Sequence, residues 1–157
     1  MKKSGYFLLV FILVIIINDA VKSQIRVCRG TSFDEVVYTI DDPRFLRGES
    51  SEVLYTIRDA TLCEGTSYDV VFTRRDEVIC SGTSYDVLLT MRGYNFCEGT
   101  SYDVLYTYRD NKIYRGTTFD KILYTFRDGE PTETVLMYMM AILYTTRGIE
   151  GAEDRDQ

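Results

Sequence analysis

A short phrase of sequence recurs through most of the chain, and this repeat limits the fold more than any other feature. One copy, residues 99–109, reads GTSYDVLYTYR. A threonine that follows an aromatic residue or leucine marks each copy: Thr39, Thr56, Thr73, Thr90, Thr107, Thr125 and Thr145. The first four intervals between these threonines are 17 residues, the fifth is 18 and the last is 20. This regular spacing predicts seven tandem units of one small module.

Two further residues recur at a nearly fixed distance from the threonine. An arginine follows it by two residues in six units, whereas Asp41 takes that place in the first. A glycine precedes it by eight or nine residues in the first six units: Gly30, Gly48, Gly65, Gly82, Gly99 and Gly116. Glycine repeated at one place predicts a backbone conformation that other residues avoid.

The residues within one unit predict a β-hairpin of about 17 residues. Residues 104–109 are rich in β-branched and aromatic side chains, which is typical of a strand. Asp110 and Asn111 then suit a two-residue turn, because both residue types tolerate a positive φ. Residues 112–115 would return as a shorter strand. The Thr-Ser-Tyr-Asp phrase would turn the chain into the next unit through side chains that bond to their own backbone.

We therefore predict an all-β fold in which seven hairpins cover one another's apolar faces. A closed ring, prism-like or barrel-like, leaves no exposed strand edges, whereas an open hairpin stack is the alternative. Residues 135–143 are the most apolar run after the N-terminal segment, and we expect them to be buried. A ring buries such a terminal run more easily than a stack does. Residues 24–148 would form this single domain, and residues 149–157 an acidic, disordered tail.

Strand alternation gives each unit two faces. One carries Leu105, Thr107 and Arg109, and we infer that this nearly invariant set faces the interior, with the arginine pairing with an aspartate at the rim. Exposed Arg–Asp pairs of little energetic value are the alternative. The last position of the other face is predicted to lie near solvent because its residue type drifts: Ile40, Ile57, Arg74, Met91, Tyr108, Phe126 and Thr146.

Residues 1–23 have the organisation of a secretory signal peptide. Two lysines precede an unbroken apolar run from Tyr6 to Ile17, and the mature chain would begin at Gln24. A retained anchor is the alternative, but a spanning helix needs about 20 apolar residues. We therefore expect a secreted, extracellular protein without stable membrane insertion after cleavage.

The four cysteines, Cys28, Cys63, Cys80 and Cys97, occupy one equivalent place in four units. An even number of cysteines in a secreted chain suggests disulfides. Neighbouring hairpins would hold these positions about 9–10 Å apart, beyond disulfide reach, although partners across a narrow ring could meet. Buried free thiols that replace other apolar residues are the alternative. No metal site is predicted, because no Cys-x-x-Cys spacing and no histidine exists.

The residue inventory argues against catalysis. Without histidine, neither a Ser-His-Asp nor a Cys-His arrangement can form. The aspartates recur once per unit, whereas an active site is usually a single asymmetric place. We predict no enzyme activity and no cofactor. The chain carries 24 acidic and 18 basic residues, a balance that argues against nucleic-acid binding.

Aromatic residues in the loops between units are the one candidate ligand platform: Phe33, Tyr68, Tyr85, Tyr102 and Phe119. Each could offer a flat apolar surface to a sugar, or could instead pack against the adjacent hairpin. We expect a non-enzymatic protein with a structural role in an extracellular matrix or coat, whose partner is a matrix polymer or glycan. A soluble, multivalent lectin-like or defence-related protein is the alternative, and the oligomeric state stays open.

Overall fold

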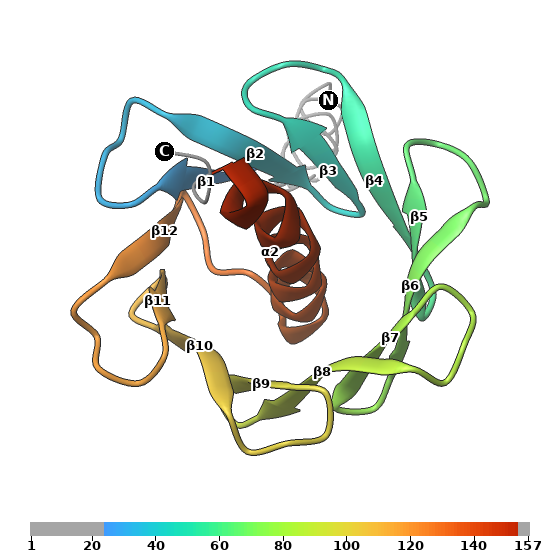
Figure 1. The fold of residues 1–157 in the computed structure, drawn as a ribbon. Coiled ribbons are helices and arrows are strands. Elements are labelled where there is room, and N and C mark those ends of the chain that lie inside the picture. Colours follow the sequence, from blue (N-terminus) through green and yellow to red (C-terminus); the bar gives the residue numbers. More distant parts are fainter. Residues whose placement is uncertain (1–23, 154–157) are drawn as a thin grey trace, which may run out of the picture.

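The computed structural model describes residues 24–153, with side chains described through residue 146. Within this described range, twelve antiparallel strands close into a barrel, and one helix runs through its centre (Figure 1). Every strand pairs with its neighbours in the chain, so the sheet is an uninterrupted succession of hairpins. The all-β closed ring predicted from the repeat is confirmed, and the open stack is excluded.

Each repeat unit supplies one long and one short strand. The six-residue strands are β2 (Val36–Asp41), β4 (Val53–Arg58), β6 (Val70–Arg75), β8 (Val87–Arg92), β10 (Val104–Arg109) and β12 (Ile122–Arg127). The short strands are β1 (Ile25–Arg29), β3 (Arg44–Arg47), β5 (Thr61–Glu64), β7 (Val78–Ser81), β9 (Asn95–Glu98) and β11 (Lys112–Arg115). Hydrophobic patterning and turn chemistry predicted this alternation of lengths.

The ring closes between the two ends of the sheet. Strand β1 pairs antiparallel with β12, with Arg26 opposite Arg127 and Cys28 opposite Thr125. The first strand in the chain is therefore the short strand of the last hairpin. Six hairpins result, and the predicted seventh is absent from residues 24–153.

The seventh unit is a helix, α2 (Glu133–Glu153), and this corrects the prediction of seven hairpins. Thr132 caps its first turn, because its hydroxyl accepts a hydrogen bond from the Val135 amide at 3.3 Å. The predicted burial of residues 135–143 is confirmed, since every one of them is at most 4% exposed. A helix enclosed by a barrel must be apolar on all sides. The apolar residues of 135–143 therefore show neither the alternation of a strand nor the one-sided stripe of a surface helix.

The interior of the barrel is formed by the face opposite to the one we predicted. Tyr106, with Ile113 and Phe96 of the adjacent strands, belongs to the core, whereas Thr107 lies on the outer face. The strand bulges at Leu105, which shifts the alternation, and Leu105 is half-buried against the core. Simple alternation could not locate that bulge.

The position whose residue type drifts faces the helix rather than solvent. Met91 and Phe126 are buried in the core, and Arg74 bonds the first turn of α2 through Glu133, at 2.5 Å, and Thr134. A ring of six similar strands surrounds one asymmetric helix, so each strand meets a different side of it. The residue type at this strand position varies because six similar strands contact six different sides of one helix.

The turns and loops have the predicted backbone conformations. Asp110 and Asn111, between β10 and β11, have φ values of 50° and 57°. The six repeated glycines have φ values between 51° and 65°, a region that favours glycine. In the loop after β5, the Ser67 hydroxyl donates to the Glu64 carbonyl at 2.8 Å and accepts from the Asp69 amide at 2.9 Å.

Two predicted segments fall partly or wholly outside the described residues. The signal peptide proposed for residues 1–23 lies outside them, and so do residues 154–157 of the predicted acidic tail. Residues 149–153 of that tail are the last residues of α2. No helix in the described part of the chain is long and apolar enough to cross a membrane.

Candidate functional site

Five of the six loops between hairpins present an aromatic ring that stacks with an arginine. The arginine comes from the end of the preceding long strand. The distances from guanidinium carbon to ring centre are 4.2 Å for Arg58–Tyr68, 4.0 Å for Arg75–Tyr85, 4.1 Å for Arg92–Tyr102, 5.3 Å for Arg109–Phe119 and 3.8 Å for Arg127–Phe33. An aspartate was the predicted partner of the arginine, and Arg109 does lie 3.4 Å from Asp110 in an exposed ion pair. In all five places, however, the arginine also stacks on an aromatic ring, which was not predicted.

The arginine also attaches the loop to the strand. Arg58 donates to the Thr66 carbonyl at 2.9 Å and to the Ser67 carbonyl at 3.3 Å. Arg75 and Arg92 reach the equivalent carbonyls of Thr83 and Thr100 at 3.5 and 3.4 Å. In these three sectors stacking and hydrogen bonding together hold one face of the ring against the protein, and in the sectors of Arg109 and Arg127 the stack does so.

The rings nevertheless remain open to solvent. Tyr68 is 80% exposed, and Tyr85 and Tyr102 are each 79% exposed. Phe33 and Phe119 are less exposed, at 55% and 42%, and Phe119 also makes an edge contact with Tyr114. All five residues of the candidate platform are thus exposed, and they belong to loops that project outward from the ring (Figure 1).

The repeated threonine supports each loop from below. Its buried hydroxyl donates to the carbonyl of the repeated glycine, which begins the loop. The six bonds are Thr39–Gly48, Thr56–Gly65, Thr73–Gly82, Thr90–Gly99, Thr107–Gly116 and Thr125–Gly30, at 2.5 to 2.7 Å. The last of these spans the closure of the ring. A constant geometric partner explains why the residue is always threonine.

The four cysteines lie beneath the same loops. Cys63, Cys80 and Cys97 are paired across the strands with Thr56, Thr73 and Thr90. All four are free and buried. At Cys28, burial raises the pKa of the thiol, against the smaller opposing effect of the nearby arginines. These thiols therefore lie buried on the outer face of the sheet, each opposite the repeated threonine of the neighbouring long strand.

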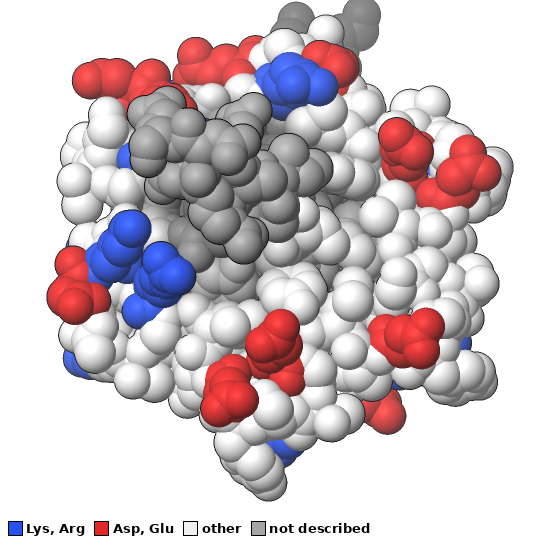
Figure 2. Space-filling model, in the orientation of Figure 1, with Lys and Arg blue, Asp and Glu red and all other residues white. Residues whose placement is uncertain are grey.

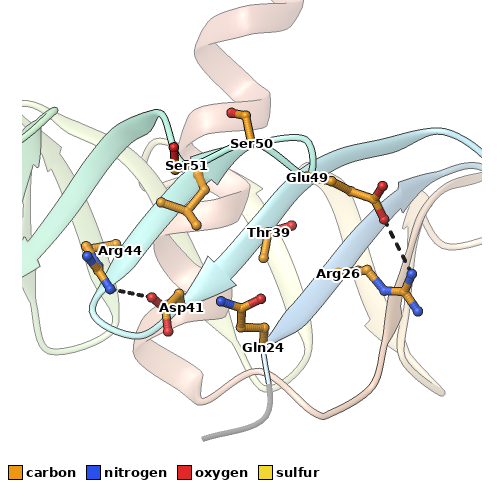
Figure 3. A pocket seen from close by; sticks show the side chains of 9 residues that line it. Gln24, Arg26, Thr39, Asp41, Arg44, Glu49, Ser50 and Ser51 are labelled. Atoms are coloured by element: carbon orange, nitrogen blue, oxygen red, sulfur yellow. Dashed lines mark hydrogen bonds and ion pairs between the residues drawn. The ribbon is translucent and has the colours of Figure 1, made fainter.

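One of the six sectors lacks the arginine–aromatic stack. We call it the open sector; it consists of β2, β3 and the loop of residues 48–52. Asp41 stands where the other sectors have the arginine, and Ser51 stands where they have the aromatic residue. A pocket of about 540 Å³ lies there (Figure 3); its lining residues are Gln24, Arg26, Thr39, Asp41, Arg44, Leu46, Glu49, Ser50 and Ser51.

The charged side chains of this pocket are paired. Asp41 bonds to Arg44, and Arg26 lies 2.6 Å from Asp128 and 3.5 Å from Glu49. The hydrogen bond with Asp128 is the main cause that raises the pKa of Arg26, and it lowers the pKa of Asp128. Arg26 is therefore already neutralised by Asp128, and its longer contact with Glu49 is secondary.

Two smaller pockets lie near Tyr94, at the hairpin turn between β8 and β9. They have volumes of about 290 and 250 Å³, and both are lined by Tyr94, Tyr108 and Glu130.

No group of three or more metal-ligating side chains occurs among the described residues. Acidic side chains lie in separate clusters around the periphery of the face drawn in Figure 2.

A family model described as a 6-fold beta flower protein matches the chain twice, over residues 15–102 and 67–153. The chain therefore belongs to the beta-flower family. No curated protein and no solved structure matches it. The two matches end 51 residues apart, which is the length of three 17-residue repeats. The family model therefore aligns with this beta-flower protein in two ways that differ by a shift of three repeats.

Six-fold organisation was hidden in the sequence by the seventh threonine, Thr145, which lies in α2 and bonds to its own helix. The signals for a helix were nonetheless present. Thr132 is a typical N-cap, and residues 135–143 include methionine, leucine and alanine, all strong helix formers. The open sector could also have been found, since Asp41 and Ser51 both depart from their repeat consensus.

Proposed function

We propose that this beta-flower protein is a secreted, non-enzymatic binding protein that attaches to a repetitive extracellular polymer, such as a matrix glycan. The observation that carries the proposal is the set of five exposed aromatic rings at equivalent positions around one rigid ring. Three of them are about 80% exposed although they are large and amphipathic. Isolated exposed rings are common, but a symmetric series of them fits a ligand that repeats.

The arginine beneath each ring supports binding through the opposite face. An aromatic ring that is already fixed loses little conformational freedom when a sugar stacks on it. The tyrosine hydroxyls and the neighbouring loop hydroxyls add polar groups at the edge of each platform. Several weak contacts on one rigid frame then combine, because the second contact is made at a high effective concentration.

A structural role in a matrix or coat is the form of this function that we favour, and a soluble lectin-like role is the second candidate. Both use the same rings, but they differ in the state of the polymer. A matrix component is retained on insoluble polymer after washing. A soluble lectin is released from it by short oligosaccharides that compete for single sites.

Co-sedimentation with insoluble polysaccharides tests the proposal. The full chain is incubated with chitin, cellulose and peptidoglycan, and the bound fraction is measured as a function of polymer concentration. A variant with Tyr68, Tyr85 and Tyr102 all changed to Ala is expected to bind at least about tenfold more weakly, since avidity depends on several contacts.

Tyr94→Ala is the matched control. Tyr94 is 69% exposed but lies in a hairpin turn, outside the five stacked rings. It should sediment with the polymer as the unmodified protein does. Equal binding by the triple variant and the unmodified protein would refute the role of the rings.

A further inference from the structure

We propose that the pocket of the open sector binds a guanidinium group, supplied by an arginine side chain or a related small molecule, in the place where the other five sectors hold their own arginine. This proposal is independent of polymer binding, because none of the five stacked aromatic rings lines the pocket.

The five sectors that have an arginine–aromatic stack show which chemical group the fold accommodates above the strand and loop. In each, a guanidinium lies over the aromatic ring of the loop, and in the sectors of Arg58, Arg75 and Arg92 it donates to a loop carbonyl. The sheet, the threonine bond and the loop are all retained in the open sector, since Thr39 donates to the Gly48 carbonyl at 2.5 Å. The strands and loop around the site are therefore unchanged, and only the arginine and the aromatic side chain are missing.

Both members of the stack are replaced in the same sector. Loss of the arginine alone would leave an aromatic ring without its support, and loss of the ring alone would leave an exposed arginine. Replacement by Asp41 and Ser51 instead removes two large side chains from one place and leaves the pocket of about 540 Å³. That volume lies in the ordinary range for small-ligand pockets.

The polar groups of the pocket favour a cation. Glu49 and Ser50 occupy the positions of Thr66 and Ser67, whose carbonyls accept from Arg58 in the next sector. Asp41 is a carboxylate and has no hydrogen to donate to these carbonyls. It accepts a bond from Arg44 but, like any carboxylate, has further lone pairs to offer a planar guanidinium.

The carboxylates of the pocket are not equally engaged. The lining carries two arginines, Arg26 and Arg44, and two carboxylates, Asp41 and Glu49. Asp128 outside the lining is the main partner of Arg26 at 2.6 Å, so Glu49 keeps only a 3.5 Å contact with that arginine and can accept from an added cation. Figure 3 shows Asp41 and Glu49 on two sides of the pocket with Ser50 and Ser51 above Thr39.

Calorimetric titration of the full chain with N-acetyl-L-arginine amide tests this site. The neutral citrulline analogue, which has nearly the same shape, is the control ligand, and free arginine shows whether a small molecule suffices. We expect one arginine amide bound per chain, weaker binding at high salt, and at least about tenfold weaker binding of the citrulline analogue, since charge-assisted hydrogen bonds are lost.

Two variants locate the binding in the open sector. The Asp41→Asn variant should bind arginine amide about tenfold more weakly. The double variant Asp41→Arg/Ser51→Tyr rebuilds the stack found in the other sectors, so it should fold normally and bind no ligand. Absence of binding by the unmodified protein, or equal binding by the rebuilt variant, would overturn the proposal. Equal binding of the citrulline analogue would also overturn it.

Discussion

The guanidinium carbon of Arg75 lies 4.0 Å from the centre of the Tyr85 ring, and the same arginine donates to the Thr83 carbonyl at 3.5 Å. Arg75 ends strand β6, whereas Tyr85 lies in the loop that follows β7. One side chain therefore connects a long strand to the loop ten residues ahead of it. The stack recurs in five sectors, in four with the ring ten residues after the arginine and in the fifth between Arg127 and Phe33 across the closure of the ring. The position of each exposed ring is therefore set by the sheet as well as by the loop.

Replacing this arginine by a residue of similar length should release the ring at little cost in stability. Exposed cation–π contacts contribute about 0.5–1 kcal/mol, so Arg75→Met should lower the free energy of unfolding by about 1 kcal/mol or less. Amide hydrogen exchange in residues 82–86 should accelerate. Arg47→Met, which removes only an exposed ion pair with Glu52, is the control and should leave that loop unchanged.

The threonine bond should matter more than the stack because it is buried. Thr90 is 7% exposed, and its hydroxyl donates to the Gly99 carbonyl at 2.5 Å. Thr90→Val keeps the shape but leaves that carbonyl without this donor, at a cost of about 1–3 kcal/mol in unfolding free energy. Urea unfolding measures the loss. The exposed Thr66→Val should change stability little, and equal effects at the two sites would contradict this assignment.

Much of this architecture follows from local chemistry that the sequence shows directly. Asp110 and Asn111 predict a tight turn because their side chains tolerate positive φ, and the turn is there. The constant threonine predicts one constant partner, which is the carbonyl of the repeated glycine. Such features need only a few neighbouring residues, so a single repeat already contains the information.

The parts that could not be predicted depend on distant elements. The helix α2 replaces a seventh hairpin because the six hairpins leave an apolar centre to be filled, and no single unit reveals that space. The interior face was assigned wrongly because the constant threonine was taken for an interior residue, whereas it is constant because its hydroxyl bonds to a loop carbonyl on the outer face. The open sector is visible in the sequence at Asp41 and Ser51, but only the fold shows that the two residues share one pocket.

The repeated glycines should tolerate substitution according to backbone conformation rather than space. Gly82 has a φ of 51°, and a Cβ atom there would lie 3.8 Å from its nearest neighbour, the Val70 carbonyl oxygen. Gly82→Val should therefore lose about 1–2 kcal/mol from backbone strain alone. Gly82→Asn should lose less, because asparagine enters this region more readily. Thermal unfolding of both variants checks the order, and a reversed order would refute the explanation.

Tyr138 is the polar side chain at the centre of the barrel. It is fully buried in α2, and its hydroxyl lies near the backbone of Arg74 without making a hydrogen bond of good geometry to any described residue. Burial raises the pKa of this phenol to about 12, against a smaller opposite effect of Arg74. The neutral phenol is thus favoured in the folded state, whereas the unfolded chain ionises near pH 10.

Tyr138→Phe should consequently remove a pH dependence as well as an unpaired hydroxyl. With tyrosine, this group leaves stability unchanged below about pH 10, and stability then falls by about 2–3 kcal/mol as the pH rises from about 10 to about 12. With phenylalanine that part of the decline disappears, and stability at pH 7 rises by about 1 kcal/mol because no buried hydroxyl lacks a partner. Urea unfolding at pH 7, 10 and 11.5 measures both effects. An unchanged slope between pH 10 and 11.5 would show that Tyr138 does not titrate as its burial requires.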